Sequence, residues 1–173
     1  EAGEGMLGIW VDIVGIFMLA FSVASVLALL GWSAGVWTVT LANLLAAWLG
    51  WGAALFPLSA GLIGIALLAR SFGWLDHVSW RRVIAAELAA VFLLGLAHLL
   101  IARSLSQAHG VALSETLVGR DLVLQALAGR GGGKVGWAVV VLASRAMPES
   151  PTSVLGMLFG VTSAYAIGLS WKH

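Results

Sequence analysis

Two ionisable side chains stand inside a long apolar stretch, where an ionisable group is costly and therefore informative. One helical face carries residues at an i, i+4, i+7, i+11 spacing: Glu87, Val91, Leu94 and His98. An acid and an imidazole on one such stripe could relay protons or bind an ion. His98 is also the one candidate for axial ligation of a haem iron or a tetrapyrrole magnesium. In the alternative, structural role, Glu87 pairs with Arg81 or Arg82, and His98 donates a hydrogen bond to a helix carbonyl.

A glycine-rich stretch, Gly129-Arg130-Gly131-Gly132-Gly133-Lys134, invites comparison with a phosphate-binding loop. The pattern G-x-x-x-x-G-K-[ST] would need glycine at position 128 and a hydroxyl at position 135, but the chain has Ala128 and Val135. The stretch therefore predicts a flexible connector and no nucleotide site. With no cysteine, the chain also has no thiolate metal ligand or Cys nucleophile. We expect no catalytic residue, no metal site and no cofactor, and hence a protein that is not an enzyme.

Small residues form the most informative pattern, because they recur every four positions on two apolar stretches. The members are Gly156, Gly160, Ala164 and Gly168 on the later stretch, and Ala20, Ala24 and Ala28 on the earlier one. In lipid, helices associate by close approach of their backbones, which small residues permit. The stripes are predicted helix-packing faces, and the later one could pack inside the chain or against another subunit.

Composition identifies the kind of element that carries these residues. Hydrophobic residues make up 61% of the 173 residues and charged residues only 10%, against roughly 25% charged in an ordinary soluble domain. No Asp, Glu, Lys or Arg occurs within residues 13–69, 88–102 or 150–171. This distribution predicts an integral membrane protein whose first partner is the lipid bilayer. A net charge of +1 gives no basic field for nucleic acid, so no nucleic-acid partner is expected.

The uncharged runs predict an all-α integral membrane protein built as a single membrane domain over residues 1–173. A crossing needs about 20 apolar residues, so turn-forming and charged residues divide the runs into spans. The expected elements are four transmembrane helices at about 9–30, 52–69, 83–101 and 151–171, and two short re-entrant or interfacial half-helices at about 36–49 and 135–146. A short amphipathic helix is expected between Glu115 and Ala128.

Orientation follows from the Lys and Arg residues of the short loops. The link between the second and third spans holds Arg70, Arg81 and Arg82, with His77 beside them. It is therefore predicted to be cytoplasmic, and an even number of spans places the N- and C-termini on the same side. The expected location is a bacterial cytoplasmic (inner) membrane, with a multi-pass topology.

Three stretches together resemble the N-terminal four-span membrane domain of the FtsK/SpoIIIE family of bacterial DNA translocases. Leu49-Gly50-Trp51-Gly52-Ala53-Ala54-Leu55-Phe56-Pro57-Leu58 is similar to the signature that opens its second span. Arg81-Arg82 before a span that ends in Ala97-His98-Leu99-Leu100 is similar to its third. Gly131-Gly132-Gly133-Lys134-Val135-Gly136, a short apolar helix, a Pro-containing turn and a last span resemble its C-terminal third.

The resemblance implies a membrane anchor, because in that family this domain anchors a hexameric ATPase motor at the division septum and contacts other division proteins. The motor's own motifs are absent here. The sequence therefore predicts a non-catalytic anchor and oligomerisation module that binds copies of itself or a larger membrane complex. One alternative is an accessory structural subunit of an energy-converting or pigment-bearing complex, and another is a small transporter. Whether the native chain continues past His173 into a motor stays open at this point.

Overall fold

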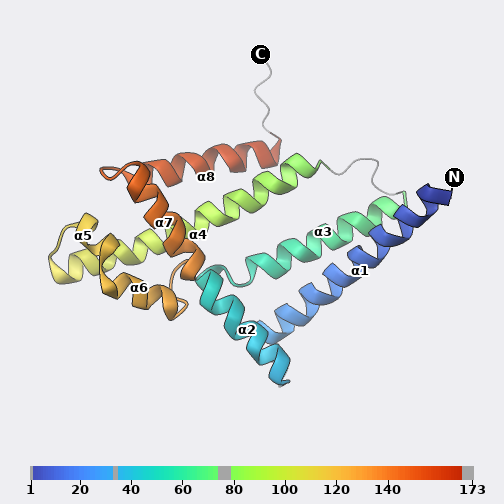
Figure 1. Cartoon of the computed structure of the whole chain (residues 1–173), viewed down its shortest axis with the longest axis horizontal. Coiled ribbons are helices and arrows are strands. Elements are labelled where there is room, and N and C mark those ends of the chain that lie inside the picture. The colour runs from blue at the N-terminus through green and yellow to red at the C-terminus, as the bar shows by residue number, and fades with distance from the viewer. Residues whose placement is uncertain (1, 33–34, 74–78, 169–173) are drawn as a thin grey trace, which may run out of the picture. The chain divides into compact units, whose positions relative to one another are not determined.

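The computed structural model describes residues 2–32, 35–73 and 79–168, all of it helices and the turns between them (Figure 1). Helices account for 85% of the described residues and no strand forms among them, which confirms the all-α prediction. The elements are α1 (Ala2–Leu29), α2 (Val36–Leu49), η1 (Gly50–Gly52), α3 (Leu55–Ser71), α4 (Trp80–His109), α5 (Leu113–Val118), α6 (Arg120–Leu127), α7 (Gly133–Ala146) and α8 (Pro151–Ile167).

The chain packs as two units. The first consists of residues 1–42 and 54–80, and the second of residues 43–53 and 81–173. The chain passes from one unit to the other within α2, whose last residues pack with the second unit. The expectation of a single membrane domain over the whole chain stays a prediction.

In the first unit, α1 and α3 lie side by side and run antiparallel (Figure 1). Their backbones approach closely where glycines face the partner helix. A methyl group on Gly64 would lie 2.8 Å from the Gly15 carbonyl oxygen, and one on Gly61 would lie 2.5 Å from Ser22 Oγ. Near the start of α3, the rings of Phe21 and Phe56 meet edge to face, with their centroids 6.1 Å apart. The pair is thus held by close backbone packing, as expected for helices in lipid.

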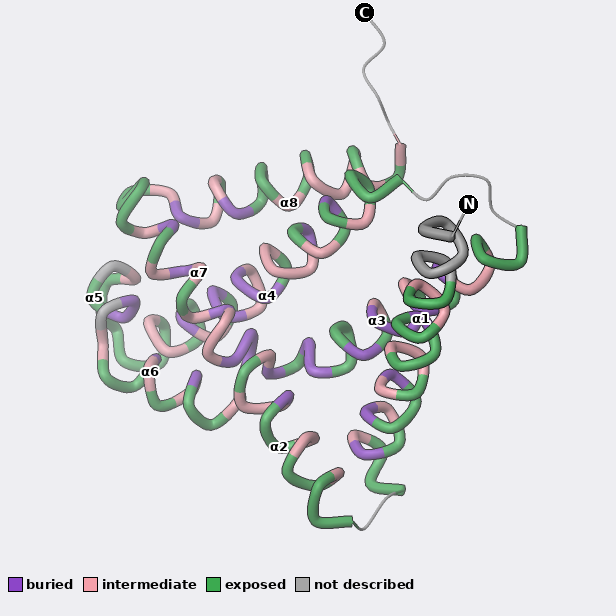
Figure 2. The backbone as a smooth tube through the Cα atoms, turned by 45° about the vertical axis from the view of Figure 1, so that its right-hand side comes forward, coloured by how far each residue is buried: buried purple, intermediate pink, exposed green. Residues whose placement is uncertain are grey.

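In the second unit, the core lies between α4, the short helices α5 and α6, α7 and the start of α8 (Figure 2). Its buried members are Leu99, Ala102, Leu117, Leu122, Val140, Ala143 and Leu155. Ala102 is four residues from His98 and three from Leu99, so it shares a face of α4 with each of them. The sequence predicted one amphipathic helix over 115–128. Gly119, with an extended backbone (φ −67°, ψ 147°), instead divides it into α5 and α6.

Helices α4 and α8 of the second unit contact each other near both of their ends and run antiparallel. At one end, Arg103 Nη2 donates to Thr152 Oγ1 at 3.3 Å. At the other end, a methyl group on Gly168 would lie 3.2 Å from the Arg82 guanidinium carbon. Gly168 ends α8 with a left-handed backbone (φ +87°), a conformation that glycine adopts without strain. Arg82 therefore brings a positive charge to the C-terminal end of α8, where the helix dipole favours a cation.

Two helices in the described part of the chain are long and apolar enough to cross a membrane, α1 over Ile9–Leu29 and α4 over Trp80–His109. These match the predicted spans at 9–30 and 83–101, although α4 extends further at both ends. Helix α3 reaches the required length only when combined with α2 and η1 across a break, and α8 is a shorter apolar helix. Residues 169–171 of the fourth predicted span lie outside the described residues. Two membrane-capable helices are shown, and the count of four stays a prediction.

Both predicted half-helices form. Helix α2 occupies Val36–Leu49, as predicted, and α7 begins at Gly133, two residues before the predicted start at 135, and ends at Ala146. At about 1.5 Å per residue, 14 residues reach only about 21 Å, less than the roughly 30 Å hydrocarbon core. Neither helix is therefore long enough to cross the core by itself.

Candidate functional site

The glycine-rich stretch is buried, which contradicts the predicted flexible connector. Gly131, Gly132 and Gly133 are all buried against other parts of the second unit. A methyl group on Gly132 would collide with the Leu94 carbonyl oxygen, and one on Gly136 would lie 2.5 Å from the same oxygen. The stretch therefore packs on the backbone of α4. We call residues 129–133 the glycine turn.

The other side of the glycine turn meets the end of α2 and η1. Gly131 accepts a 2.7 Å hydrogen bond from the Trp51 backbone N–H. A methyl group on Gly50 would collide with the Gly131 carbonyl. A methyl group on Gly133 would lie 2.7 Å from the Trp48 carbonyl oxygen. Both glycines have positive φ (58° and 59°), so a side chain would be strained at either position even with more space. The turn thus joins the end of α2 to α4 through contacts that only glycines allow.

His98 lies under the glycine turn, with none of its surface exposed. A methyl group on Gly131 would lie 3.2 Å from His98 Nδ1, and one on Gly136 would lie 3.2 Å from its Cβ. The backbone of Arg130 is close to the ring, but neither ring nitrogen makes a hydrogen bond of acceptable geometry. The predicted bond from the imidazole to a helix carbonyl is therefore not formed. A haem or tetrapyrrole could reach either nitrogen only if the turn moved away.

Glu87 lies on the same face of α4 and is half-buried. Eleven residues separate it from His98, which is about 16 Å along the helix, so the two groups do not meet. The predicted pairing of Glu87 with Arg81 or Arg82 is not formed, because both arginines are exposed and no salt bridge occurs among the described residues. Arg82 lies instead against Gly168. The stripe thus carries two separate polar groups rather than a joined site.

The later small-residue stripe is exposed at Gly156 and Gly160, and α8 is a mixture of exposed and half-buried residues apart from the buried Pro151 and Leu155 (Figure 2). A methyl group on Gly156 or on Gly160 would meet nothing within 4 Å. Ala164 is half-buried, and Gly168 forms the C-terminal cap beside Arg82. Within the described part of the second unit, no neighbour packs against Gly156 or Gly160.

The earlier stripe is only partly used inside the first unit. Ala28 is buried, whereas Ala20 and Ala24 are exposed. Close packing between α1 and α3 depends instead on residues that the sequence analysis did not single out: Gly15, Ser22, Gly61 and Gly64. The i, i+3 spacing of the two α3 glycines, inside a charge-free helix, is the signal that could have indicated them.

Three buried polar atoms besides those of His98 have no hydrogen-bond partner among the described residues. They are Asp12 Oδ1 and Ser25 Oγ in α1, and Trp137 Nε1 in α7. Asp12 lies three residues inside the apolar segment that begins at Ile9, where a carboxylate is costly. The four groups lie on three helices: Asp12 and Ser25 on α1, His98 on α4 and Trp137 on α7.

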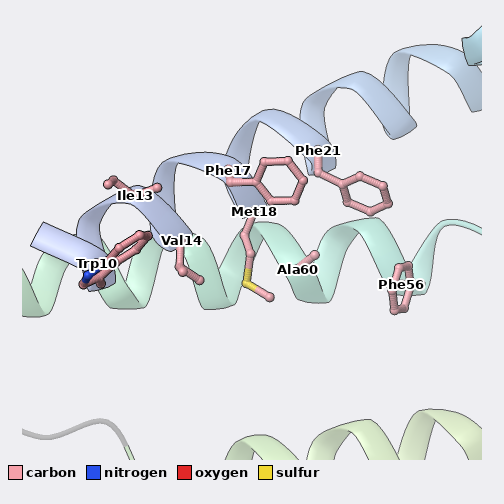
Figure 3. A pocket seen from close by; sticks show the side chains of 8 residues that line it. All are labelled: Trp10, Ile13, Val14, Phe17, Met18, Phe21, Phe56 and Ala60. Atoms are coloured by element: carbon pink, nitrogen blue, oxygen red, sulfur yellow. The ribbon is translucent and has the colours of Figure 1, made fainter. Parts of the chain in front are cut away.

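An open apolar groove runs along the α1–α3 pair (Figure 3). Its volume is about 540 Å³, and it is lined by Trp10, Ile13, Val14, Phe17, Met18, Phe21, Phe56 and Ala60. Every lining side chain is apolar apart from the indole N–H of Trp10. The groove therefore suits hydrocarbon and offers no group for acid–base or nucleophilic chemistry.

A smaller hollow of about 260 Å³ lies beside α5, outside the apolar part of α4, and its ionisable members are His109, Glu115 and Asp121. Carboxylate and imidazole groups are metal ligands when three or more converge. No group of three such side chains close enough to hold a metal ion occurs in the described ranges.

No protein-family model, curated protein or solved structure matches this chain.

Proposed function

We propose that this protein is a non-catalytic membrane anchor and assembly module, with a four-span membrane domain like that of the FtsK-type translocases. In this proposal α1, α3, α4 and α8 cross a bacterial cytoplasmic membrane, α2 and α7 enter it as half-helices, and both termini are cytoplasmic. The module binds other membrane subunits, either copies of itself or members of a larger complex, and no nucleic acid.

The observation that carries the proposal is the open face of α8. Gly156 and Gly160 leave a shallow surface on which another helix could approach closely, and nothing in the described part of its own unit occupies it. Small residues are selected at helix contacts in lipid because side chains there would keep the backbones apart. By contrast, the glycines of the α1–α3 pair and of the glycine turn are already covered by their neighbours. The uncovered pair on α8 is therefore the best place for a further subunit.

The distribution of polar groups also supports an assembly role over transport. A transport pathway needs several polar groups that face each other within the membrane. In α4, Glu87 and His98 are about 16 Å apart along the helix, and His98 is enclosed by the glycine turn. Between them the face consists of Val91 and Leu94. This arrangement favours packing over the passage of an ion.

The substitution Gly160→Leu tests the proposal. It places a large side chain on the open face of α8, and it should leave the fold intact because no neighbour within the chain is displaced. Protein extracted from membranes into polymer nanodiscs should then lose its higher-mass assemblies, measured as the mass distribution of single particles. Val161→Leu, on an adjacent exposed position, is the matched control and should retain them. An unchanged mass distribution for Gly160→Leu would show that this face binds no subunit.

A further inference from the structure

The outer side of the glycine turn presents two cations at fixed positions. Arg130 is exposed, and its Nη1 donates a 3.1 Å hydrogen bond to Gln125 Oε1. Lys134, at the first turn of α7, holds its Nζ 5.2 Å from the centre of the Trp48 ring. Because the glycines between them are packed on the backbones of α2 and α4, these two side chains start from a rigid base. The pair is thus pre-arranged rather than carried on a loose loop.

Two exposed tryptophans lie in residues 43–53, the segment that packs against the glycine turn. Trp48 is 50% exposed and Trp51 is 67% exposed, and both belong to the same packing unit as the turn. The Trp51 backbone N–H is bonded to Gly131 within the turn itself. Tryptophan is enriched at the headgroup level of membranes, where its ring contacts hydrocarbon and its N–H contacts polar groups. The Lys134 ammonium against one exposed indole, with a second exposed indole in the same segment, is therefore typical of a membrane–water interface.

The charge of this surface is not neutralised locally. No Asp or Glu occurs in residues 36–72, which contribute the tryptophans, or in residues 122–144, which contribute the cations. The nearest acid along α6 is Asp121, nine residues before Arg130. Neither cation makes a salt bridge in the described part of the chain. The surface therefore has a net positive charge and suits an anion.

The position of the glycine turn along α4 is consistent with the membrane–water interface. Gly131 lies against His98 and Gly132 against the Leu94 carbonyl, so the turn is level with the Leu94–His98 turn of α4. From Trp80, at the start of α4, to this turn is about 21–27 Å at 1.5 Å per residue, which approaches the roughly 30 Å hydrocarbon core. An exposed arginine deeper in the core would cost several kcal/mol. With Trp80 at one membrane surface, the glycine turn lies at the other.

From these observations we infer that Arg130 and Lys134, flanked by Trp48 and Trp51, form a binding surface for the phosphate group of an anionic phospholipid. The occupant is a lipid rather than a free anion, because the cations lie beside exposed indoles at the end of an apolar helix, where acyl chains would continue from the headgroup. The inference rests on the proposed placement of the protein in a membrane. It does not depend on the assembly face of α8.

The test is competition between lipids on the full-length purified chain. Native mass spectrometry with equimolar phosphatidylglycerol and phosphatidylcholine should show preferential retention of phosphatidylglycerol. A basic residue near a membrane surface contributes about 1 kcal/mol of attraction to anionic lipid, which is about a fivefold preference. Arg130→Gln or Lys134→Gln should each reduce the preference about fivefold, and the double variant about thirtyfold. Lys134→Arg keeps the charge and should keep the preference.

Arg145→Gln is the matched control, because Arg145 is an exposed cation near the other end of the same helix α7, and it should leave the preference unchanged. An equal preference for phosphatidylglycerol in the wild type and in the variant with both Arg130→Gln and Lys134→Gln would refute the proposed lipid site. So would displacement of the lipid by millimolar inorganic phosphate, since that would make the occupant a free anion. Failure of the wild type to insert into phosphatidylglycerol vesicles would instead refute the membrane placement.

Discussion

The substitution Gly136→Ala tests whether the glycine turn and α7 pack on α4 as described. An added methyl group would lie 2.5 Å from the Leu94 carbonyl oxygen and 3.2 Å from His98 Cβ. Carbon–oxygen contacts are normally about 3.3 Å or longer, so the methyl group would be roughly 0.8 Å too close. The oxygen belongs to the backbone of α4 and can give way only if one helix moves. Overpacking of this kind costs about 1–3 kcal/mol.

The opposing effect is helix propensity, because Ala is favoured over Gly within a helix by about 0.5–1 kcal/mol. The expected net result for Gly136→Ala is therefore a loss of about 1–2 kcal/mol in the free energy of unfolding. Gly156→Ala is the matched control, since Gly156 is also inside a helix but an added methyl group there meets nothing within 4 Å. That variant should be unchanged or more stable by up to about 1 kcal/mol.

Both variants can be measured by unfolding in mixed detergent micelles, followed by far-UV circular dichroism at increasing SDS. The decisive result is which of the two variants has the lower free energy of unfolding, because the effects of detergent and of helix propensity are common to both. A Gly136→Ala protein as stable as Gly156→Ala would refute the packing of α7 against the backbone of α4.

Three further substitutions follow from the same contacts. Gly64→Leu should separate α1 from α3, because even a methyl group there would lie 2.8 Å from the Gly15 carbonyl oxygen; a loss of about 1–3 kcal/mol is expected, and unchanged SDS unfolding would contradict it. Gly168→Ala should lower stability by about 1–2 kcal/mol, the penalty of a left-handed backbone for a residue with a side chain; an equal midpoint in thermal unfolding would show that the cap is not required. His98→Leu should raise the thermal midpoint, since a buried imidazole without hydrogen bonds costs about 1–3 kcal/mol, and a lower midpoint would reveal a stabilising partner of the ring.

Charge placement made much of the fold predictable from the sequence. Because a charged side chain is costly in lipid, the charge-free runs predicted the positions of α1 and α4. The glycine and proline residues that border α2 and α7 predicted the bounds of these two helices to within two residues. The number of crossings could not be fixed in the same way. Helix α3 has 17 residues and α8 has 17 described residues, so both fall just short of the length that identifies a span by itself.

The candidate sites were less predictable, because their character depends on pairs of residues far apart in the sequence. The glycine-rich stretch has the composition of a flexible loop, and only its contacts with Gly50 and Leu94 make it rigid. Likewise, the spacing of Gly156 and Gly160 indicates a smooth face but not what covers it. Periodicity reports which residues share a face; it contains no information on the partner of that face.

Anchoring by a helix that crosses the bilayer is the central claim, and cysteine accessibility tests it most directly. The chain has no native cysteine, so His77→Cys and His109→Cys each introduce a single reporter, one in the segment before α4 and one at its last residue. In sealed vesicles of known orientation, a membrane-impermeant maleimide should label the two positions from opposite sides. Labelling of both positions from the same side would show that α4 does not cross the membrane and would contradict the account.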